Sequence, residues 1–372
     1  FMIPREVGGT ETYLCQTLAA MLEQFPQNDH ILFTNIENDP VLKERFSRFR
    51  NVEYRCLGFR AGNRYSRILR EQFQLPGVVK KSGVDVLWSP GYTAPHKVNC
   101  PQVVTIHDMQ YKSHPEDMPF INRIVTDVLV NMAVRKCDRI IAVSEFSKSE
   151  IIKYTGVNGE KIDVTPEAAD PVFGKPVEVD RRKQILSALG IGDKPYILCV
   201  SNTYPHKKVG VLVEAFEAIA GTIPHNLVII GRPRLGEPDV KWAIAKSKFS
   251  DRIKRIEYVD FGDLPAIYQS ADLFVFPSVY EGFGLPVLEA MMAGVPVVTT
   301  RLASIPEVGG NYVVYAEEVS AETLGDKIVD TIGWDKGCRV QLIEAARKAA
   351  RGFSWQKTAG LTIESLKTAV NP

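Results

Sequence analysis

Two glutamates in a glycine-punctuated stretch offer the clearest chemistry in this sequence. The stretch runs from Pro277 to Glu289 as PSVYEGFGLPVLE and follows the apolar run 273–276. That run predicts a buried parallel strand, and a helix is expected to begin near Leu285. The backbone N–H groups of such a loop, with a helix N-terminus behind them, can seat phosphate oxygens. Glu281 and Glu289 frame this seat, and their carboxylates can accept hydrogen bonds from sugar hydroxyls around a diphosphate.

Two other interpretations of the stretch are available. Acidic residues at a helix N-terminus can simply complement the helix dipole. A dinucleotide-binding loop is the second, but Gly282 and Gly284 are followed by Val287 where that fingerprint requires a third small residue. The sequence therefore favours a nucleotide-sugar site over a dinucleotide site.

The whole pattern Pro-Ser-x-x-Glu-Gly-Phe-Gly-Leu-Pro-x-x-Glu-Ala resembles the signature of a large enzyme family. It is similar to that of the retaining, nucleotide-sugar-dependent glycosyltransferases of group 1, of the family 4 and mannosyltransferase-like type. The resemblance implies the α/β GT-B fold, with two Rossmann-like doubly wound domains facing each other across a cleft. It also implies that Glu281 contacts the sugar and that Glu289 holds the ribose hydroxyls. The residues between them are expected to bind the donor; they include Gly282, Phe283, Gly284 and Leu285.

Length and composition indicate a globular protein of two domains. The chain has 372 residues, which is long for one hydrophobic core and sufficient for two domains of ordinary size. Its hydrophobic fraction of 45% and charged fraction of 24% are ordinary for globular chains, and its net charge of +1 predicts no particular partner. No apolar run approaches the roughly 18 residues that a membrane span needs.

Six cysteines are scattered singly, mostly through apolar stretches, without a Cys-x-x-Cys pair or a neighbouring histidine. This usage is typical of buried, reduced thiols and favours a cytosolic protein. The six are Cys15, Cys56, Cys100, Cys137, Cys199 and Cys338.

Apolar strands alternate with amphipathic segments in both halves, which predicts doubly wound parallel sheets. Strands are expected at 31–34, 52–57, 84–88, 103–106 and 140–143, and then at 196–200, 227–230, 256–259, 273–276 and 295–299. Ser144 should cap a helix that begins at Glu145. The proline-rich stretch 165–180 is the expected linker between the halves.

We therefore expect a first Rossmann-like domain at 1–175, a second at 176–353 and a tail helix at 354–372. The resemblance implies that the first domain binds the acceptor and the second the nucleotide sugar. It also implies that the tail helix crosses back onto the first domain. Because the chain enters its first Gly-Gly loop with hardly any strand before it, we expect that a first strand is missing from this sequence.

A lysine follows the first expected strand of the second domain. At the carboxyl end of a parallel strand and just before a helix, Lys207 can neutralise a diphosphate leaving group as the glycosidic bond breaks. The resemblance supports this choice, since the family has a lysine at the matching position. Many members also have an arginine near Asn202, so one diphosphate contact is absent here unless His206 or Lys208 replaces it. The alternative is a solvated lysine pair, although two cations oppose the dipole of a helix start unless an anion is bound.

His107 ends the strand expected at 103–106, at the edge where open α/β sheets bind ligands. The resemblance implies that this histidine faces the transferred sugar, close to the reacting carbon. Without the resemblance, a structural role for His107 would be an equally good interpretation. Gly8 and Gly9 resemble the family's glycine loop, whose backbone approaches the diphosphate or the acceptor. They could equally form a tight turn before a helix.

Further donor contacts are expected from the second sheet. Arg232, after Gly231, could reach a phosphate or the nucleobase, or it could be an ordinary surface arginine. Tyr258 and Val259 end the next expected strand and should present their backbone to the base. These four residues complete the expected donor site.

No Asp-x-Asp motif is present, and no His, Asp or Glu cluster has metal-ligand spacing in the sequence. We therefore expect no metal and no cofactor beyond the nucleotide-sugar donor, with Lys207 and backbone dipoles in place of a divalent cation. The resemblance implies that the anomeric configuration is retained. Because no carboxylate is obviously placed as a covalent nucleophile, we favour a front-face displacement in which the leaving phosphate accepts the acceptor's proton.

Residues 43–81 carry eleven basic and three acidic side chains, an excess of eight in a chain whose net charge is +1. Apolar and aromatic residues alternate with them: Phe46, Phe49, Phe59, Tyr65, Ile68, Leu69 and Phe73. Such a stretch resembles a surface that lies against anionic lipid, which would suit an acceptor carried on a lipid diphosphate. An exposed, solvated arginine-rich face is the alternative, and nucleic acid is disfavoured because no recognition module accompanies the charge.

We predict a cytoplasmic retaining hexosyltransferase, peripheral at the inner membrane face if 43–81 touches lipid. The preferred donor is GDP-mannose, with a UDP-sugar as the other option, and the acceptor is a saccharide or a polyprenyl-diphosphate-linked saccharide of a cell-surface polysaccharide. Two rivals remain. One is a non-hydrolysing sugar-nucleotide epimerase, and the other is a catalytically inert sugar-nucleotide-binding subunit, suggested by Asn202 where an arginine is common.

Overall fold

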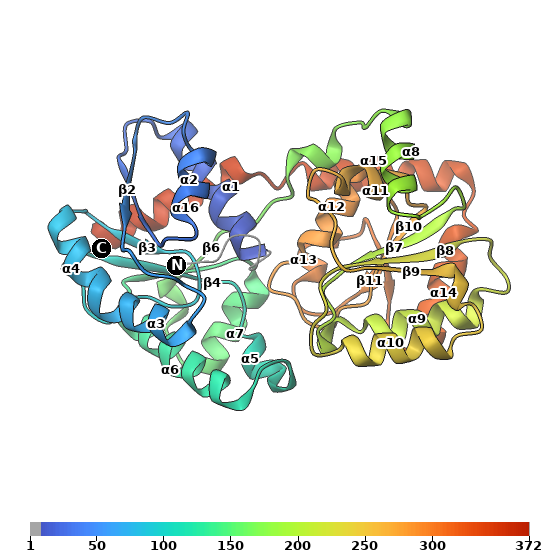
Figure 1. Cartoon of the computed structure of the whole chain (residues 1–372), viewed down its shortest axis with the longest axis horizontal. Coiled ribbons are helices and arrows are strands. Elements are labelled where there is room, and N and C mark those ends of the chain that lie inside the picture. The colour runs from blue at the N-terminus through green and yellow to red at the C-terminus, as the bar shows by residue number, and fades with distance from the viewer. Residues whose placement is uncertain (1–8, 372) are drawn as a thin grey trace. The chain divides into compact units, whose positions relative to one another are not determined.

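The computed structural model describes residues 9–371, which form two compact units (Figure 1). The first unit holds the chain through Ser113, then Pro119–Glu167 and the segment from Ser354 onward. The second holds His114–Met118 and Ala168–Phe353. The change of unit at 167/168 differs from the boundary that we expected at 175/176. Its physical reason is Phe173, which is fully buried in the second unit against the rings of Phe261 and Tyr268.

The first unit is built on short parallel strands. Its elements are α1 (Gly9–Gln24), β1 (His30–Thr34), α2 (Asp39–Arg45), β2 (Val52–Cys56), α3 (Arg64–Leu69), the π-helix η1 (Arg70–Gln74), α4 (Leu75–Ser82), β3 (Leu87–Ser89), β4 (Gln102–Ile106), α5 (Gln110–Ser113), α6 (Phe120–Lys136), β5 (Arg139–Ala142), α7 (Glu145–Thr155), β6 (Ile162–Val164) and α16 (Trp355–Val370). Strands β3-β4-β5-β6 form one parallel sheet in that order, and β1 pairs with β2 in a separate parallel ribbon. Every residue of β4 is buried, as expected for a strand covered on both faces.

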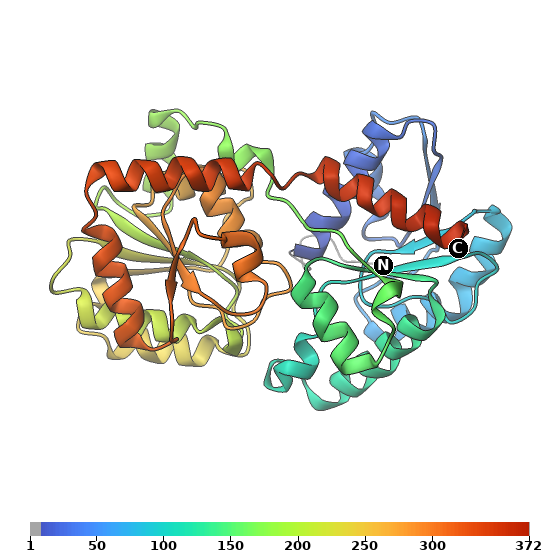
Figure 2. The ribbon, with the colours of Figure 1, turned by 180° about the vertical axis from the view of Figure 1, so that it is seen from behind.

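The last helix of the chain belongs to this first unit. Figure 2 shows α16 beside α1, and the two helices are in contact. Thr358 donates a hydrogen bond to the carbonyl of Pro166 at 2.6 Å, and Ser365 donates one to the Asp163 carboxylate at 2.7 Å. Trp355, at the start of α16, packs edge-on against Tyr13 of α1. Helix α16 therefore closes a hydrophobic core that α1 begins.

The second unit is a six-stranded parallel sheet with helices around it. Its elements are η2 (Pro115–Asp117), η4 (Pro171–Gly174), α8 (Val179–Ala188), β7 (Tyr196–Val200), η5 (Pro205–Lys207), α9 (Val209–Ile219), β8 (Asn226–Ile230), α10 (Glu237–Lys246), β9 (Ile253–Ile256), α11 (Leu264–Ser270), β10 (Leu273–Phe276), α12 (Leu285–Ala293), β11 (Val297–Thr300), α13 (Ile305–Gly309), β12 (Val314–Ala316), α14 (Ala321–Ile332) and α15 (Lys336–Ala350). The strand order is β12-β11-β10-β7-β8-β9. Numbered within the sheet, this is the doubly wound order 3-2-1-4-5-6, whose order reverses between β7 and β10.

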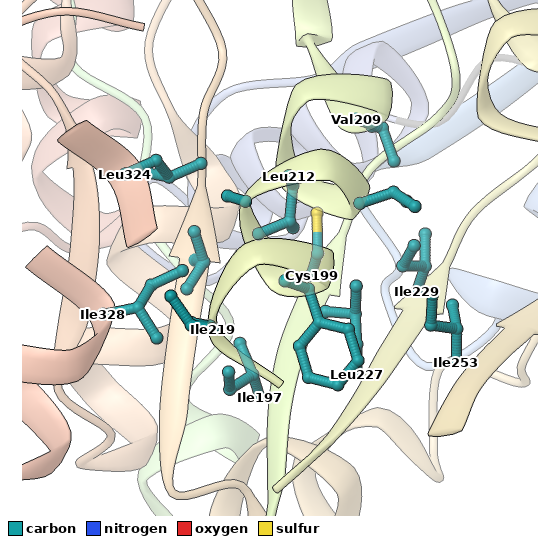
Figure 3. Close-up of a cluster of buried hydrophobic side chains, with 14 of the residues drawn as sticks. Ile197, Cys199, Val209, Leu212, Ile219, Leu227, Ile229, Ile253, Leu324 and Ile328 are labelled. Carbon is teal, nitrogen blue, oxygen red and sulfur yellow. The ribbon is translucent and has the colours of Figure 1, made fainter. Parts of the chain in front are cut away.

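One hydrophobic core of the second unit lies between the sheet and helices α9 and α14. Helix α9 buries Val209, Leu212, Val213 and Phe216, the i, i+3, i+4, i+7 spacing of an amphipathic helix. Figure 3 shows Leu212 above the sheet with Leu324 and Ile328 of α14 beside it. The sulfur of Cys199 points into the same cluster, and burial raises the pKa of this thiol to about 12. Cys199 is therefore an inert packing residue.

The predicted elements agree with the structure to different degrees. Strands expected at 196–200 and 273–276 are found at those residues, and Ser144 caps α7 as predicted, accepting a hydrogen bond from the N–H of Ser147. The prediction of a strand at 256–259 is wrong, because β9 ends at Ile256. Strands β6 and β12 were not predicted; each has three residues, too few for a clear hydrophobic period.

Two further expectations are corrected by burial, and a third by the start of a strand. Cys56 and Cys338 are exposed, so only part of the cysteine set is buried; all six are free thiols. Phe46 and Phe59 are core residues, 1% and 5% exposed, and cannot belong to a lipid-facing surface. The strand expected at 84–88 starts later than predicted, because Val84 precedes β3, which starts at Leu87.

Over the described residues, none of the helices has the length and apolarity needed to cross a bilayer.

Candidate functional site

Two loops leave the second sheet at the point where its strand order reverses. The first follows β7 and runs through η5 to Lys208, and the second follows β10 and runs from Pro277 to Gly284. A backbone hydrogen bond of 3.0 Å from the N–H of Val279 to the carbonyl of His206 joins them. Ligands of open α/β sheets bind at this reversal, outside the carboxyl ends of the strands. The fold therefore brings together the two stretches that the sequence selected.

Lys207 and Glu281 meet across these two loops. The Lys207 Nζ lies 2.5 Å from Oε1 of Glu281 and 5.6 Å from the centroid of the Phe276 ring. Their side chains are 17% and 11% exposed, so the pair is largely removed from water while an edge stays accessible. Because Lys carries three N–H donors, Nζ can hold Glu281 and still donate to an anion.

The loop that carries Glu281 is fixed by hydroxyl groups from the neighbouring strand end. Thr300 donates to the carbonyl of Ser278 at 2.6 Å, and Ser304 Oγ lies 2.9 Å and 2.8 Å from the carbonyls of Glu281 and Phe283. In a trans peptide the N–H points opposite to the carbonyl. The N–H of Gly284 therefore points away from Ser304.

Gly284 occupies a position that only glycine fits easily. Its φ is +111°, and a Cβ there would lie 2.9 Å from Cδ1 of Ile305. Helix α12 begins at the next residue, Leu285, as predicted. Phe283 has its side chain buried against the ring of Phe353, 5.7 Å between centroids, so only its backbone can meet a donor.

Glu289 lies one turn inside α12 and has a partner that the sequence did not reveal. The buried Tyr268 of α11 donates a hydrogen bond of 2.9 Å to Oε2 of Glu289. Burial raises the pKa of Glu289 to about 7; the Tyr268 hydrogen bond opposes this rise and the charge of Asp170 adds to it. The carboxyl group therefore changes charge near neutral pH, although the residue keeps partial contact with solvent. No spacing rule connects residues 268 and 289, so only the tertiary fold pairs them.

Asn202 and Gly231 hold the first loop against the end of β8. The side-chain oxygen of Asn202 accepts a hydrogen bond of 2.9 Å from the N–H of Arg232, and the N–H of Thr203 donates to the carbonyl of Arg232 at 3.2 Å. Gly231 has φ +151°, and a Cβ there would lie 2.1 Å from the carbonyl oxygen of Ser201. In the structure described here, Asn202 and Gly231 shape the loop, and any donor contact would be additional.

We expect Gly231→Ala to unfold the second unit more easily. The added Cβ would clash with the Ser201 backbone and force a positive φ on alanine, so unfolding should become easier by at least about 2 kcal/mol. Urea unfolding measures the change. Gly262→Ala is the matched control, because a Cβ at Gly262 would meet open space; equal stability of the two variants would contradict the assignment.

Arg232 and Tyr258 lie together at the far end of this edge. The guanidinium of Arg232 stands 5.3 Å from the centroid of the Tyr258 ring, which is 52% exposed. A flat aromatic ring carrying a cation is a surface on which a nucleobase can stack. Val259 is 8% exposed, so its side chain is a packing residue, and only its backbone could present itself to a base.

His107 lies in the first unit, directly after β4, and both its ring nitrogens are engaged. Nδ1 lies 3.2 Å from Oε1 of the buried Glu167, and Nε2 lies 3.0 Å from the carbonyl oxygen of Pro90. Because a carbonyl only accepts, Nε2 carries a hydrogen. Burial favours the neutral ring, but the hydrogen bond and charge of Glu167 prevail and raise the pKa of His107. To contact a sugar through Nε2, His107 would have to exchange the Pro90 carbonyl for a sugar oxygen.

We expect Glu167→Gln to destabilise the first unit most strongly at low pH. A histidine with a raised pKa stabilises the fold fully below its unfolded pKa of about 6.5, and this contribution disappears as pH rises through the folded pKa. The loss should be about 1–3 kcal/mol at pH 6 and smaller at pH 9, measured by urea unfolding. Glu364→Gln on the exposed side of α16 is the control; a loss independent of pH would show that Glu167 does not hold a charged His107.

Two remaining expectations concern Gly9 and the metal. Gly8 lies outside the described residues, and Gly9 is the first residue of α1. Contrary to the expectation from sequence, the described residues contain one group with metal-ligand spacing: the ligand atoms of His114, Glu116 and Asp117 lie within 4.8 Å of one another. The Asp117 carboxylate already contacts Nδ1 of His206 at 2.5 Å, with both side chains buried. His206 therefore anchors segment 114–118 of the second unit through its Nδ1.

Sequence reasoning missed the side chains that support the site. Tyr268, Ser304 and Glu167 each touch a selected residue or its loop, yet none lies in a recognisable motif. Tyr268 and Glu167 are far from their partners in sequence, and a serine such as Ser304 at a helix start has no special signal beyond capping. Their roles depend on tertiary contacts alone.

Comparison with known proteins identifies the class. HepE of Anabaena, solved in complex with UDP-glucose, superposes with a TM-score of 0.76 at 17% identity over 99% of this chain and 98% of that chain. At that identity the likeness defines the fold, which is the GT-B fold of glycosyltransferases, as predicted.

The family follows from sequence. Residues 7–173 match the family model for glycosyltransferase family 4, and residues 194–333 match that for glycosyl transferases group 1. Together they span most of the chain, which therefore belongs to this glycosyltransferase family, as the glutamate signature predicted.

Two relatives have named activities. The O-antigen chain mannosyltransferase B of Escherichia coli is 29% identical over 282 residues, which cover 75% of this chain and 73% of that protein. The O-antigen chain mannosyltransferase RfbU of Salmonella typhimurium is 25% identical over 214 residues, covering 58% of this chain and 56% of that protein. The chain thus matches little more than half the length of the second relative.

Proposed function

We propose that this glycosyltransferase transfers mannose from GDP-mannose, with retention of configuration, to a saccharide or lipid-linked saccharide acceptor in the synthesis of a cell-surface polysaccharide. We place this reaction in the cytoplasm. The observation that carries the proposal is the Lys207–Glu281 pair on the two loops at the strand-order reversal. A cation beside a glycine loop suits a diphosphate, and a carboxylate beside that cation suits a sugar hydroxyl.

The donor is argued from the relatives and from the geometry of the second unit. Both relatives described above are named as mannosyltransferases, which supports mannose. HepE was solved with UDP-glucose, so a uridine donor is the alternative for this fold. Glu289 would accept hydrogen bonds from the ribose hydroxyls, which both nucleotides share, and the Arg232–Tyr258 surface would meet the base.

The chemistry would be a front-face displacement. The bond between the anomeric carbon and the phosphate oxygen breaks as the acceptor oxygen bonds to the same face of that carbon, and the leaving phosphate takes the acceptor's proton. Lys207 would neutralise the charge that develops on the leaving diphosphate, and the N–H groups of the 277–284 loop would add oriented dipoles. His107 would lie near the sugar, held by Glu167. Detection of a stable glycosyl adduct on Glu281 would contradict this mechanism.

Thermal stabilisation by a nucleotide panel tests the donor without an acceptor. A ligand that binds only the folded protein raises Tm by mass action, by about 2.7 kcal/mol of stability at one hundred times its Kd. GDP and GDP-mannose should raise Tm in the native protein and fail to do so in Glu289→Ala. Stabilisation only by UDP and UDP-sugars would support a glycosyltransferase but contradict GDP-mannose as its donor. No stabilisation by any nucleotide would contradict the proposed donor site.

Product analysis separates the proposal from its two rivals. Incubation with the stabilising nucleotide sugar and lipid-linked or free saccharide acceptors should give a glycosylated acceptor with the donor's anomeric configuration. Conversion of the nucleotide sugar to its epimer without acceptor would indicate the epimerase. Tight binding without turnover across all acceptors would indicate the inert binding subunit.

A further inference from the structure

Arg234 lies against the turn that carries Lys207. Its guanidinium stands 5.8 Å from the centroid of the Tyr204 ring, and the carbonyl of Tyr204 accepts a hydrogen bond of 3.0 Å from the N–H of Lys207. Two contacts hold the loop of Arg234 against this turn. The N–H of Arg234 donates to Thr203 Oγ1 at 2.8 Å, and the N–H of Gly236 donates to the carbonyl of Thr203 at 2.7 Å. The fold therefore places a second cation beside the turn of Lys207.

The acid that follows Arg234 in the chain is engaged elsewhere. Oε2 of the buried Glu237 accepts hydrogen bonds from Arg255 Nη2 at 2.9 Å and from Thr203 Oγ1 at 2.8 Å. Burial by itself would raise the pKa of Glu237, but the hydrogen bonds from Arg255 and Thr203 prevail and lower it. Glu237 is therefore an ionised partner of Arg255 and a support for the Thr203 hydroxyl.

The guanidinium of Arg234 keeps unused donors. Among residues 9–371 no carboxylate forms an ion pair with Arg234, and its buried Nε has no hydrogen-bond acceptor. The side chain as a whole is half-buried, so part of it stays accessible. A buried N–H without an acceptor is destabilising unless water or a ligand accepts its hydrogen bond. A phosphate suits this arginine, because its oxygens can accept two parallel N–H bonds from a guanidinium.

One diphosphate contact is still open at this edge of the sheet. The chain has Asn202 near the place of an arginine that many family members carry, and His206 or Lys208 were its expected replacements. In the structure, Nδ1 of His206 is held by the carboxylate of Asp117, and Lys208 is exposed. Arg234 packs on the same turn from the loop after β8, a position that no local pattern connects to Lys207.

We propose that Arg234 is a second phosphate-binding residue for the nucleotide-sugar donor. Its guanidinium would donate hydrogen bonds to the donor diphosphate together with Nζ of Lys207. Thr203 is the positioning residue, since its hydroxyl accepts the N–H of Arg234 and donates to Glu237. This role rests on the proposed function, because it requires a donor diphosphate at the strand-order reversal.

Calorimetric titration with GDP and with guanosine separates a phosphate contact from a contact to the rest of the nucleotide. Arg234→Met keeps an unbranched side chain and removes the cation. We expect it to weaken GDP binding about 10- to 100-fold, the range for hydrogen bonds to a charged group, and to change guanosine binding less than about twofold. UDP and uridine replace this pair if the native protein binds only uridine nucleotides. The ligand-free variant should keep the native Tm, because Nε of Arg234 has no acceptor there.

Two further variants complete the test. Thr203→Val removes the acceptor of the Arg234 N–H, so GDP binding should weaken at least about threefold more than guanosine binding, and Thr203→Ser should restore it. Arg351→Met is the control, because Arg351 is an exposed arginine of the same unit, just after α15. It should leave the binding of both ligands unchanged.

Three results would overturn the proposal. The first is native GDP affinity in Arg234→Met. The second is an equal loss of GDP and guanosine binding, since Arg234 would then support the loop or the base. The third is a loss confined to GDP in Lys208→Met but not in Arg234→Met, since the lysine would then be the second phosphate contact. Failure of the native protein to bind any nucleotide is a distinct result, which would contradict the donor site itself and the role of Arg234 with it.

Discussion

Lys207→Ala is expected to lower kcat by roughly 10²–10³-fold, the effect typical of removing one group that stabilises developing charge. Its Nζ would no longer neutralise the leaving diphosphate, and Glu281, 2.5 Å away in the native pair, would lose its partner. An unpaired, largely buried carboxylate would repel the donor phosphates as well. Initial rates over a range of donor concentrations measure the change.

A lysine in the same unit provides the control for this prediction. Lys241→Ala removes an exposed lysine of α10 and should leave kcat and KM unchanged. Lys207→Arg keeps the charge but not the compact ammonium geometry, so partial activity is expected. A kcat within about threefold of native in Lys207→Ala would contradict the assigned role, whatever happens to KM.

The affinity for the nucleotide sugar is expected to rise with pH through about 7, where Glu289 ionises. The ionised carboxylate accepts hydrogen bonds from two hydroxyls, whereas the protonated acid donates one and accepts less well. Glu289→Ala should therefore weaken donor binding about 10- to 100-fold at pH 8, the range for hydrogen bonds to a charged group. Calorimetric titration with donor from pH 6 to 9 measures both effects.

Ionisation of Glu289 also affects stability, with the opposite sign. Its folded pKa of about 7 lies above the ordinary value of 4.5, so the native state binds more protons between those pH values. The free energy of unfolding contributed by this group therefore falls as pH rises from about 4.5 to 7. Bound donor should weaken this trend, because it favours the charged form and so lowers the pKa of Glu289.

Tyr268→Phe isolates the hydrogen bond that opposes this raised pKa. Without the phenol, ionisation of Glu289 should move to higher pH, so donor affinity should fall about threefold or more at pH 7 and recover at pH 9. Tyr196→Phe is the matched control, since it also loses a buried hydroxyl, one that donates to the carbonyl of Ile267. A pH profile that is the same in both variants would show that Tyr268 only packs.

The chemistry-bearing residues were predictable because they sit in local patterns. An apolar run, a glycine loop and a helix start can be recognised within about a dozen residues, so Glu281, Glu289 and Lys207 were selected correctly as neighbours of a sheet edge. Strands such as β7 and β10 are buried on both faces and are therefore continuous in apolar character, which fixed their ends. Short strands such as β6 and β12 carry no such signal.

The sequence by itself determined the family, the parallel α/β architecture of the two units and the loops that carry the site. Only the tertiary structure decided what each side chain contacts: Tyr268 on Glu289, and Glu167 on His107. It also assigned Phe46 and Phe59 to the core although they stand among arginines in sequence. The physical reason is that burial, and with it pKa and exposure, depends on which distant elements pack together, and a local pattern does not contain that information.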